Sequence, residues 1–215
     1  MNLKHKAAVI ATAATLGLAG TATAASAYSI TSSAGGAAVP VGTSFASSGG
    51  ALSFQNAATG ATAATCASST LNGVTGGTGV SSQLDVTSGS YTGCKVGSQN
   101  VFVTVNASAA SPWSVVPTTG TGSPFGGEVR NVNVTVRCGT ATSTPATYSG
   151  TLTTGVTETN QTDASKINLA SAGSLTKAGS GCPALPATAA VTQENVLTAV
   201  GGAPVSAANN LWLNP

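Results

Sequence analysis

Charged and aromatic side chains are scarce in this sequence of 215 residues. Charged residues make up 6% of it and aromatic residues 4%, whereas roughly 25% of an ordinary soluble domain is charged. The seven basic residues form no basic stripe, so we expect no nucleic-acid partner. Long surface helices need Glu, Lys, Arg and Leu, and the shortage of charge therefore argues against them.

The residues that most enzymes use are also missing. His5 is the only histidine and lies in the first few residues, so no Ser-His-Asp or Cys-His arrangement is expected once a leader is removed. Glu158 and Asp163 are the only sequence-near carboxyl pair, and their polar surroundings favour a solvated turn over a catalytic pair. A calcium loop needs more carboxylates than these two. We expect no enzymatic activity, no cofactor and no metal.

The N-terminus has the pattern of a secretory signal peptide. The cationic segment Lys4-His5-Lys6 precedes a short apolar run and then small residues as far as Ala27. The apolar run is too short to span a bilayer, so we expect no transmembrane segment. We expect cleavage after Ala25-Ser26-Ala27, with 22–24 as the alternative. Residues 1–27 are then a signal peptide, and the product is secreted, extracellular or loosely associated with the cell surface.

Removal of this leader leaves a chain with little charge to keep copies apart. Five basic and five acidic side chains remain, and no histidine. A near-neutral, sparsely charged protein repels its neighbours weakly, which favours self-association or adsorption at interfaces. The alternative is a monomer kept in solution by its many Ser and Thr hydroxyls.

The four cysteines all lie in the exported part: Cys66, Cys94, Cys138 and Cys182. An even number in an oxidising compartment indicates two disulfides. The chain offers no C-x-x-C pair for zinc. Of the three pairings, we favour the local ones, Cys66–Cys94 and Cys138–Cys182, and each is worth roughly 3–4 kcal/mol on the chain-entropy model.

Short β-branched runs separated by Gly, Pro and Asn predict an all-β protein, an antiparallel β-sandwich or jelly-roll-like barrel with two disulfides. Val132, Val134 and Val136 alternate with polar residues, which indicates one buried face. In 101–105 the valines lie on one face and Phe102 on the other, so both faces of that strand are candidates for burial. The segment 189–200 suits either a short helix or a strand, and the context favours a strand.

The domain organisation follows from composition. Residues 28–41 are rich in Ser, Gly and Ala and predict a flexible lead-in. Residues 42–215 then form a single β-sandwich domain, with two halves split near 118–128 as the alternative.

Two aromatic residues are the candidates for binding, Trp113 and Trp212. Trp113 follows Pro112 at the start of a strand, where core packing is favoured over ligand binding. Leu211-Trp212-Leu213 is either a last strand, which we favour, or an exposed hook for a partner.

The order of these features resembles a loose group of small secreted bacterial proteins, the alkane-oxidation-activator type of pseudomonads and similar actinobacterial proteins. The segments that carry the resemblance are Pro40–Phe45, Thr65-Cys66-Ala67, Tyr91–Cys94, Ser111-Pro112-Trp113, Cys138-Gly139 and Gly181-Cys182. The resemblance implies a non-enzymatic extracellular β protein that helps cells handle hydrophobic substrates or surfaces.

Two functions are therefore expected. The first is a structural role at the cell surface or in extracellular assembly, by self-association through unpaired strand edges or contact with a cell-surface component. The alternative is an extracellular binding module for a hydrophobic ligand (alkane or lipid) or a glycan.

Overall fold

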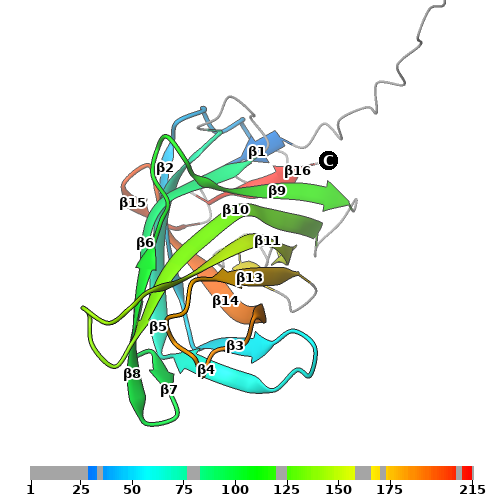
Figure 1. Cartoon of the computed structure of the whole chain (residues 1–215). Helices are drawn as coiled ribbons and strands as arrows, with labels where there is room; N and C mark the ends of the chain where they lie inside the picture. The colour runs from blue at the N-terminus through cyan, green and yellow to red at the C-terminus, as the bar shows by residue number, and fades with distance from the viewer. Residues whose placement is uncertain are drawn as a thin grey trace, which may run out of the picture.

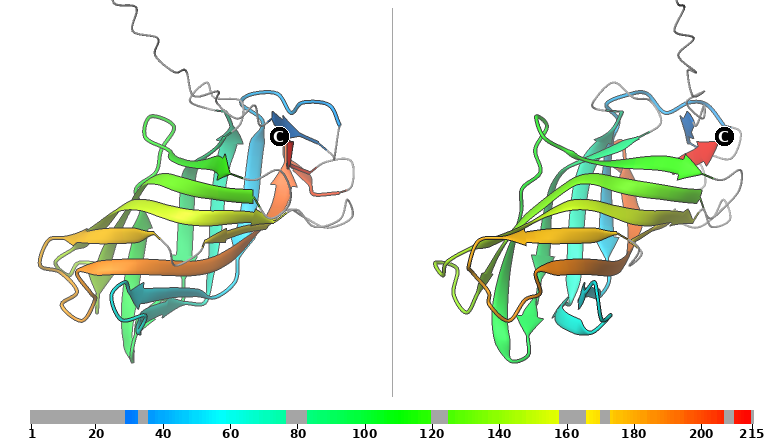
Figure 2. Two further views of the ribbon diagram at one scale, coloured as in Figure 1. Left: turned by 90° about the vertical axis from the view of Figure 1, so that its right-hand side faces the viewer. Right: turned by 45° about the vertical axis from the view of Figure 1, so that its right-hand side comes forward.

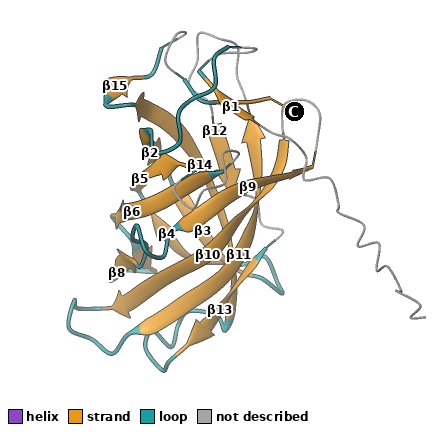
Figure 3. Cartoon of the chain, turned by 90° about the horizontal axis from the view of Figure 1, so that it is seen from above, coloured by secondary structure: helices purple, strands orange, loops and turns teal. Residues whose placement is uncertain are grey.

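The computed structural model describes residues 29–32, 36–76, 83–119, 125–157, 166–169, 173–206 and 210–214. All of the regular structure in these ranges is β-strand (Figure 3). The predicted all-β antiparallel fold is therefore confirmed. The described part of the chain has no helix that is long and apolar enough to cross a membrane. The proposed signal peptide, 1–27, lies outside the described residues.

Sixteen strands lie in the described residues, and all of their pairings are antiparallel. The first eight are β1 (Ser29–Thr31), β2 (Ser44–Gly49), β3 (Leu52–Asn56), β4 (Thr62–Cys66), β5 (Ser68–Thr75), β6 (Leu84–Thr92), β7 (Lys95–Val96) and β8 (Gln99–Val105). The others are β9 (Trp113–Thr119), β10 (Phe125–Cys138), β11 (Ala146–Thr157), β12 (Lys166–Leu169), β13 (Ser174–Ala178), β14 (Thr188–Val200), β15 (Ala203–Pro204) and β16 (Trp212–Asn214).

Fourteen of these strands form one sheet that closes on itself. Every strand from β2 to β14 has partners on two sides, because β14 pairs with β12 and β13 on one side and with β2 and β3 on the other. β2, β5, β6 and β8 run across the direction of β9, β10, β11, β13 and β14 (Figures 1 and 2). This is the arrangement of an orthogonally packed sandwich whose strands pass from one layer to the other.

The long strand β10 pairs with different strands along its length. Its first half pairs with β9 and its second half with β8, while β11 accompanies it along most of its length. The register shifts between Val129 and Val132, where Asn131 has a positive φ of 59°. Asn tolerates this left-handed conformation better than most residues. The irregularity bends the strand and so turns its two halves toward different partners.

The alternation predicted for β10 is present. Val132, Val134 and Val136 are buried in the core, as expected. The segment predicted as a strand at 189–200 is confirmed as β14. In β8, Val101 is buried, but the side chain of Phe102 is 42% exposed. The expectation that both faces of this strand are covered is therefore wrong. The valines on its inner face pack against the core, and its outer face is exposed.

Part of the expected lead-in, 28–41, forms structure. β1 pairs with the C-terminal strand β16 in a separate two-stranded sheet, and the two lie side by side in Figure 2. Ile30 is 2% exposed and belongs to the main core cluster. A Ser- and Gly-rich composition predicted flexibility, but the partner of this segment lies at the far end of the sequence and leaves no local signal. Across the alternative boundary at 118–128, β9 and β10 pair with each other.

Both predicted disulfides are present, Cys66–Cys94 and Cys138–Cys182. They close segments with sequence separations of 28 and 44 residues. The first joins the end of β4 to the segment between β6 and β7, and the second joins the end of β10 to the loop before β14. The first bridge therefore lies beside the pairing of β4 with β7, where Thr65 faces Lys95.

Tyr148 of β11 fixes the loop between β13 and β14. Its side chain is fully buried, and its hydroxyl donates a hydrogen bond to the carbonyl oxygen of Pro186. Its ring packs edge-on against Phe54, with a centroid distance of 4.8 Å. Burial raises the pKa of Tyr148 from 10.0 to about 12, because the phenolate would lie in an apolar interior.

We predict that Tyr148→Phe lowers the free energy of unfolding at pH 7 by about 1 kcal/mol, because the hydrogen bond to the Pro186 carbonyl is lost. The raised pKa adds a dependence on pH. The folded state holds the proton more tightly, so the contribution is complete below pH 10 and is lost as the pH rises toward about 12. Denaturant titrations between pH 7 and 11 should show a steeper loss of stability in the wild type than in Tyr148→Phe. Equal slopes would contradict this assignment.

Candidate functional site

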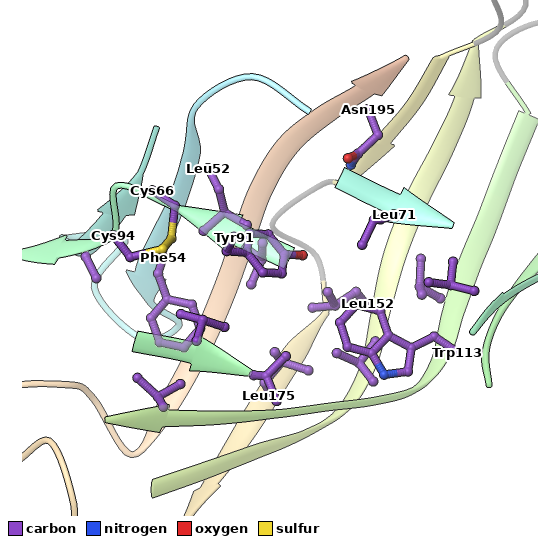
Figure 4. A pocket seen from close by; sticks show the side chains of 18 of the residues that line it. Leu52, Phe54, Cys66, Leu71, Tyr91, Cys94, Trp113, Leu152, Leu175 and Asn195 are labelled. Atoms are coloured by element: carbon purple, nitrogen blue, oxygen red, sulfur yellow. A yellow bond between two sulfur atoms is a disulfide. The ribbon is translucent and has the colours of Figure 1, made fainter. Parts of the chain in front are cut away.

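The closed sheet surrounds an apolar cavity of about 80 Å³ (Figure 4). Side chains from β2 to β6, β8 to β11, β13 and β14 line it. Labelled in Figure 4 are Leu52, Phe54, Cys66, Leu71, Tyr91, Cys94, Trp113, Leu152, Leu175 and Asn195. The cavity therefore lies in the core itself, and almost every element of the fold contributes to its wall.

The wall of this cavity exposes apolar atoms only. No lysine, arginine, aspartate or glutamate is among its lining residues. One water needs about 10–15 Å³ of such space, so the cavity has room for roughly five to eight water positions. An apolar wall offers water no hydrogen bonds, and enclosed apolar cavities can stay dry and bind small apolar molecules. The arrangement suits a hydrocarbon and offers nothing to a charged or sugar-like ligand.

The amino-acid composition explains why the sheet is hollow. The interior of a closed sheet widens with the number of its strands, and its side chains have to fill that space. In this chain valine is the commonest residue of the cavity wall, as in Val115, Val129 and Val134, and aromatic residues are only 4% of the sequence. Short side chains do not reach the centre, so space remains where larger ones would meet.

Trp113 is the one predicted binding residue that the structure places at the cavity. It lies at the start of β9 and is 4% exposed, so the expected core packing is confirmed. Its ring forms part of the cavity wall. The indole Nε1–H has no hydrogen-bond partner among the described residues. Buried donors without a partner are uncommon in proteins, and each one needs an explanation.

Trp212, the second predicted binding residue, is in another place. It belongs to β16 and pairs with Thr31 of β1, in the two-stranded sheet that is separate from the sheet around the cavity. The expected final strand is confirmed, and Leu211 before it is buried. The two tryptophans therefore belong to different sheets.

Tyr91 of β6 lines the cavity and was missed by the sequence reasoning. Figure 4 shows its ring among the side chains that line the cavity. Burial raises the pKa of Tyr91 well above its usual value. The residues directly before it on β6 are small and polar, Ser88, Gly89 and Ser90, so no apolar alternation marks position 91 as inward-facing.

The Cys66–Cys94 disulfide is part of the cavity wall next to Tyr91 (Figure 4). The sequence predicted this bridge as a stabilising crosslink. In the structure it also holds the end of β4 against the segment that follows β6, and thereby fixes one end of the cavity. The Cys138–Cys182 bridge does not line the cavity.

A buried polar cluster lies where β14 meets β2 and β5. The Asn195 Oδ1 accepts a hydrogen bond from the Ser69 hydroxyl at 3.2 Å, and the Gln193 Nε2 donates to the same hydroxyl and to the Gly50 carbonyl, each at 2.9 Å. Gly49 is required here, because a Cβ at this position would lie 2.4 Å from the Ser69 Oγ. These groups satisfy one another, so the cluster fixes strand register rather than offering a binding site.

Among the described charged residues, Asp85 is buried and held by hydrogen bonds. Asp85 is 1% exposed, and its Oδ1 accepts hydrogen bonds of 2.8 Å from the Gln83 amide and from the Ser114 hydroxyl. Within the described ranges, no cluster of His, Cys, Asp and Glu side chains could hold a metal ion. Glu158 and Asp163, the pair considered from the sequence, lie outside the described residues.

Comparisons with models of protein families, with curated proteins and with solved structures gave no match to this chain.

The cavity predicts unequal effects of two changes at Leu152 on β11. Leu152→Ala enlarges the hollow and should lower the free energy of unfolding by about 2–5 kcal/mol. Leu152→Phe extends into existing space and should change it by less than about 1 kcal/mol. The matched control is Leu197→Phe, because Leu197 is equally buried but does not line the cavity. That variant should lose about 1–3 kcal/mol through overpacking. If denaturant titrations show the same loss of unfolding free energy in both Phe variants, there is no free space beside Leu152.

Proposed function

We propose that this protein is a secreted binding protein that holds a small hydrophobic molecule, a short hydrocarbon or the end of an alkyl chain, inside its sheet. The observation that supports this function is the apolar cavity of about 80 Å³ at the centre of the core. Ligand sites in proteins are usually concave, largely preformed and mostly apolar. Burial of apolar surface supplies about 25 cal/mol per Å², so such a ligand needs no charged anchor.

The glycan alternative is less well supported. Sugars are bound through hydrogen bonds to their hydroxyls, and removal of a hydroxyl from water without a partner costs on the order of 1–3 kcal/mol. The wall of the cavity exposes no polar atoms that could accept or donate those bonds. A hydrocarbon has no such requirement and is the better match.

The structural role expected from the near-neutral charge stays a prediction. Its expected route was pairing between free strand edges, which closed sheets remove. Each strand from β2 to β14 already has partners on both sides. Self-association of this protein would therefore need another surface, and the described residues include only two exposed large hydrophobic side chains, Val41 and Phe102.

Secretion is part of the proposal. It is supported by the leader pattern in residues 1–27 and by two disulfides, since such bonds persist in oxidising compartments. The resemblance to alkane-oxidation-activator-type proteins points in the same direction, because those proteins are associated with hydrophobic substrates. In this proposal the protein binds or carries such a molecule outside the cell and performs no chemistry on it.

The test uses Trp113 as the reporter. In a Trp212→Phe variant of the oxidised protein, Trp113 is the only tryptophan. Titration with n-pentane or benzene should change its emission saturably and should raise the melting temperature, because a ligand that binds only the folded state stabilises it. Glucose serves as the polar control and should do neither.

The matched variant for this titration is Leu152→Phe, which reduces the space in the cavity. It should bind benzene at least tenfold more weakly and retain its fold. Absence of a saturable response to both hydrocarbons in the wild type would contradict the proposed function. An unchanged affinity in Leu152→Phe would place the bound hydrocarbon elsewhere and would contradict the assignment to the cavity.

A further inference from the structure

One part of the cavity wall is a loop and not a strand. Of the described residues that line the cavity, all but Cys94 and Leu185 belong to strands. Cys94 is bonded to Cys66 at the end of β4. Leu185 lies in residues 179–187, the β13–β14 loop, which Figure 1 shows as the orange tube between these two strands.

The β13–β14 loop is a single layer between the cavity and the solvent. Leu185 lines the cavity and is only 4% exposed. Pro183 and Ala184 before it, and Ala187 after it, are exposed. Leu185 is therefore a cover over the cavity, and displacement of this side chain would connect the cavity with the solvent.

This loop is more weakly held than the strands of the wall. The strands are joined by continuous ladders, as between β10 and β11, and a gap between two of them would break many hydrogen bonds. Among the described residues, two backbone hydrogen bonds hold the loop: the Lys177 N–H donates to the Ala187 carbonyl, and the Leu185 N–H donates to the Cys182 carbonyl within the loop. Segments with few such bonds open locally at the lowest free energy.

Two side chains on neighbouring strands fix the loop in its closed position. The Lys177 Nζ on β13 donates hydrogen bonds to the carbonyls of Cys182 at 2.7 Å and Leu185 at 3.3 Å. The Tyr148 hydroxyl on β11 donates to the carbonyl of Pro186. Neither Lys177 nor Tyr148 lines the cavity. These two side chains, here called the latches, therefore act on the loop without contact with the cavity.

We propose that the β13–β14 loop is the lid of the cavity, and that a hydrophobic ligand enters and leaves when Leu185 is displaced. The Cys138–Cys182 bridge anchors the start of the lid to the end of β10, so the moving part is 183–187. This inference rests on the proposed function and adds to it the control of access to the same site. The latches set how often the lid opens.

The test measures how fast benzene binds and leaves, by stopped-flow emission of Trp113 in the Trp212→Phe background. Lys177→Met removes two hydrogen bonds from a charged donor and should raise both the association and the dissociation rate at least about tenfold. Tyr148→Phe removes one and should raise both rates about fivefold. The Kd should stay within about twofold in both variants, because the latches do not contact the cavity.

The matched control is Ser114→Ala on β9. It removes a buried hydrogen bond of 2.8 Å to Asp85, and Ser114 does not line the cavity. The exchange rates of benzene in this variant should stay within about twofold of the wild type. A second readout needs no ligand: in Lys177→Met, hydrogen exchange of the Leu185 amide should accelerate by the same factor as benzene release, while the amides of β10 keep their protection.

The outcomes separate the lid from the binding function. If benzene binds but its rates in Lys177→Met and Tyr148→Phe equal those of the wild type, the lid is wrong and the binding function stands. Equal acceleration in Ser114→Ala would indicate a general loosening of the sheet and would also overturn the lid. If benzene does not bind to the wild type, the proposed function fails and the lid fails with it.

Discussion

The structure depends on the closure of one antiparallel sheet, and the long strands β10 and β14 make that closure possible. Each of them changes partners along its length, β10 from β9 to β8 and β14 from β3 to β2. Strands at both ends of the molecule are thereby joined to the same two central strands. Because the sheet closes, its backbone groups are satisfied internally and its inner face becomes a core without a second domain.

The cavity arises because the inner side chains of the closed sheet are short. A chain rich in Ala, Val, Ser and Thr can form strands that pack closely at the walls, but it does not supply the volume that fills a closed interior. The two disulfides join strand ends that the small core would hold only weakly, and Cys66–Cys94 forms part of the wall itself. A composition with few large side chains costs stability, but it leaves space in the core that a hydrophobic ligand could occupy.

Much of the local structure could be predicted from the sequence. The alternation at Val132, Val134 and Val136 predicted a strand with one buried face, the cysteine count and spacing predicted both disulfides, and Trp113 was expected in the core. These features depend on local periodicity or on short loops. The pairing of β1 with β16 joins residues at opposite ends of the chain, and no local pattern encodes such a contact.

The candidate site was predicted only in part, for the same reason. Trp113 was a candidate because an aromatic residue stands out in this sequence, whereas Tyr91 follows small and polar residues on β6 and gives no signal of an inward position. A cavity is a property of how side chains from many strands meet. The volume of the cavity depends on how the sheet closes and on the register of its strands. The sequence predicted the all-β class but not the order in which the strands pair.

The central claim, that the closed sheet holds a dry apolar space able to take a guest, is tested most directly by crystallography under xenon pressure. Xenon binds apolar cavities through dispersion alone and does not require the natural ligand to be known. The account predicts a strong anomalous peak enclosed by Trp113, Leu152 and Tyr91, with little movement of the strands around it. A cavity that stays without xenon, or that contains ordered water in its place, would contradict it.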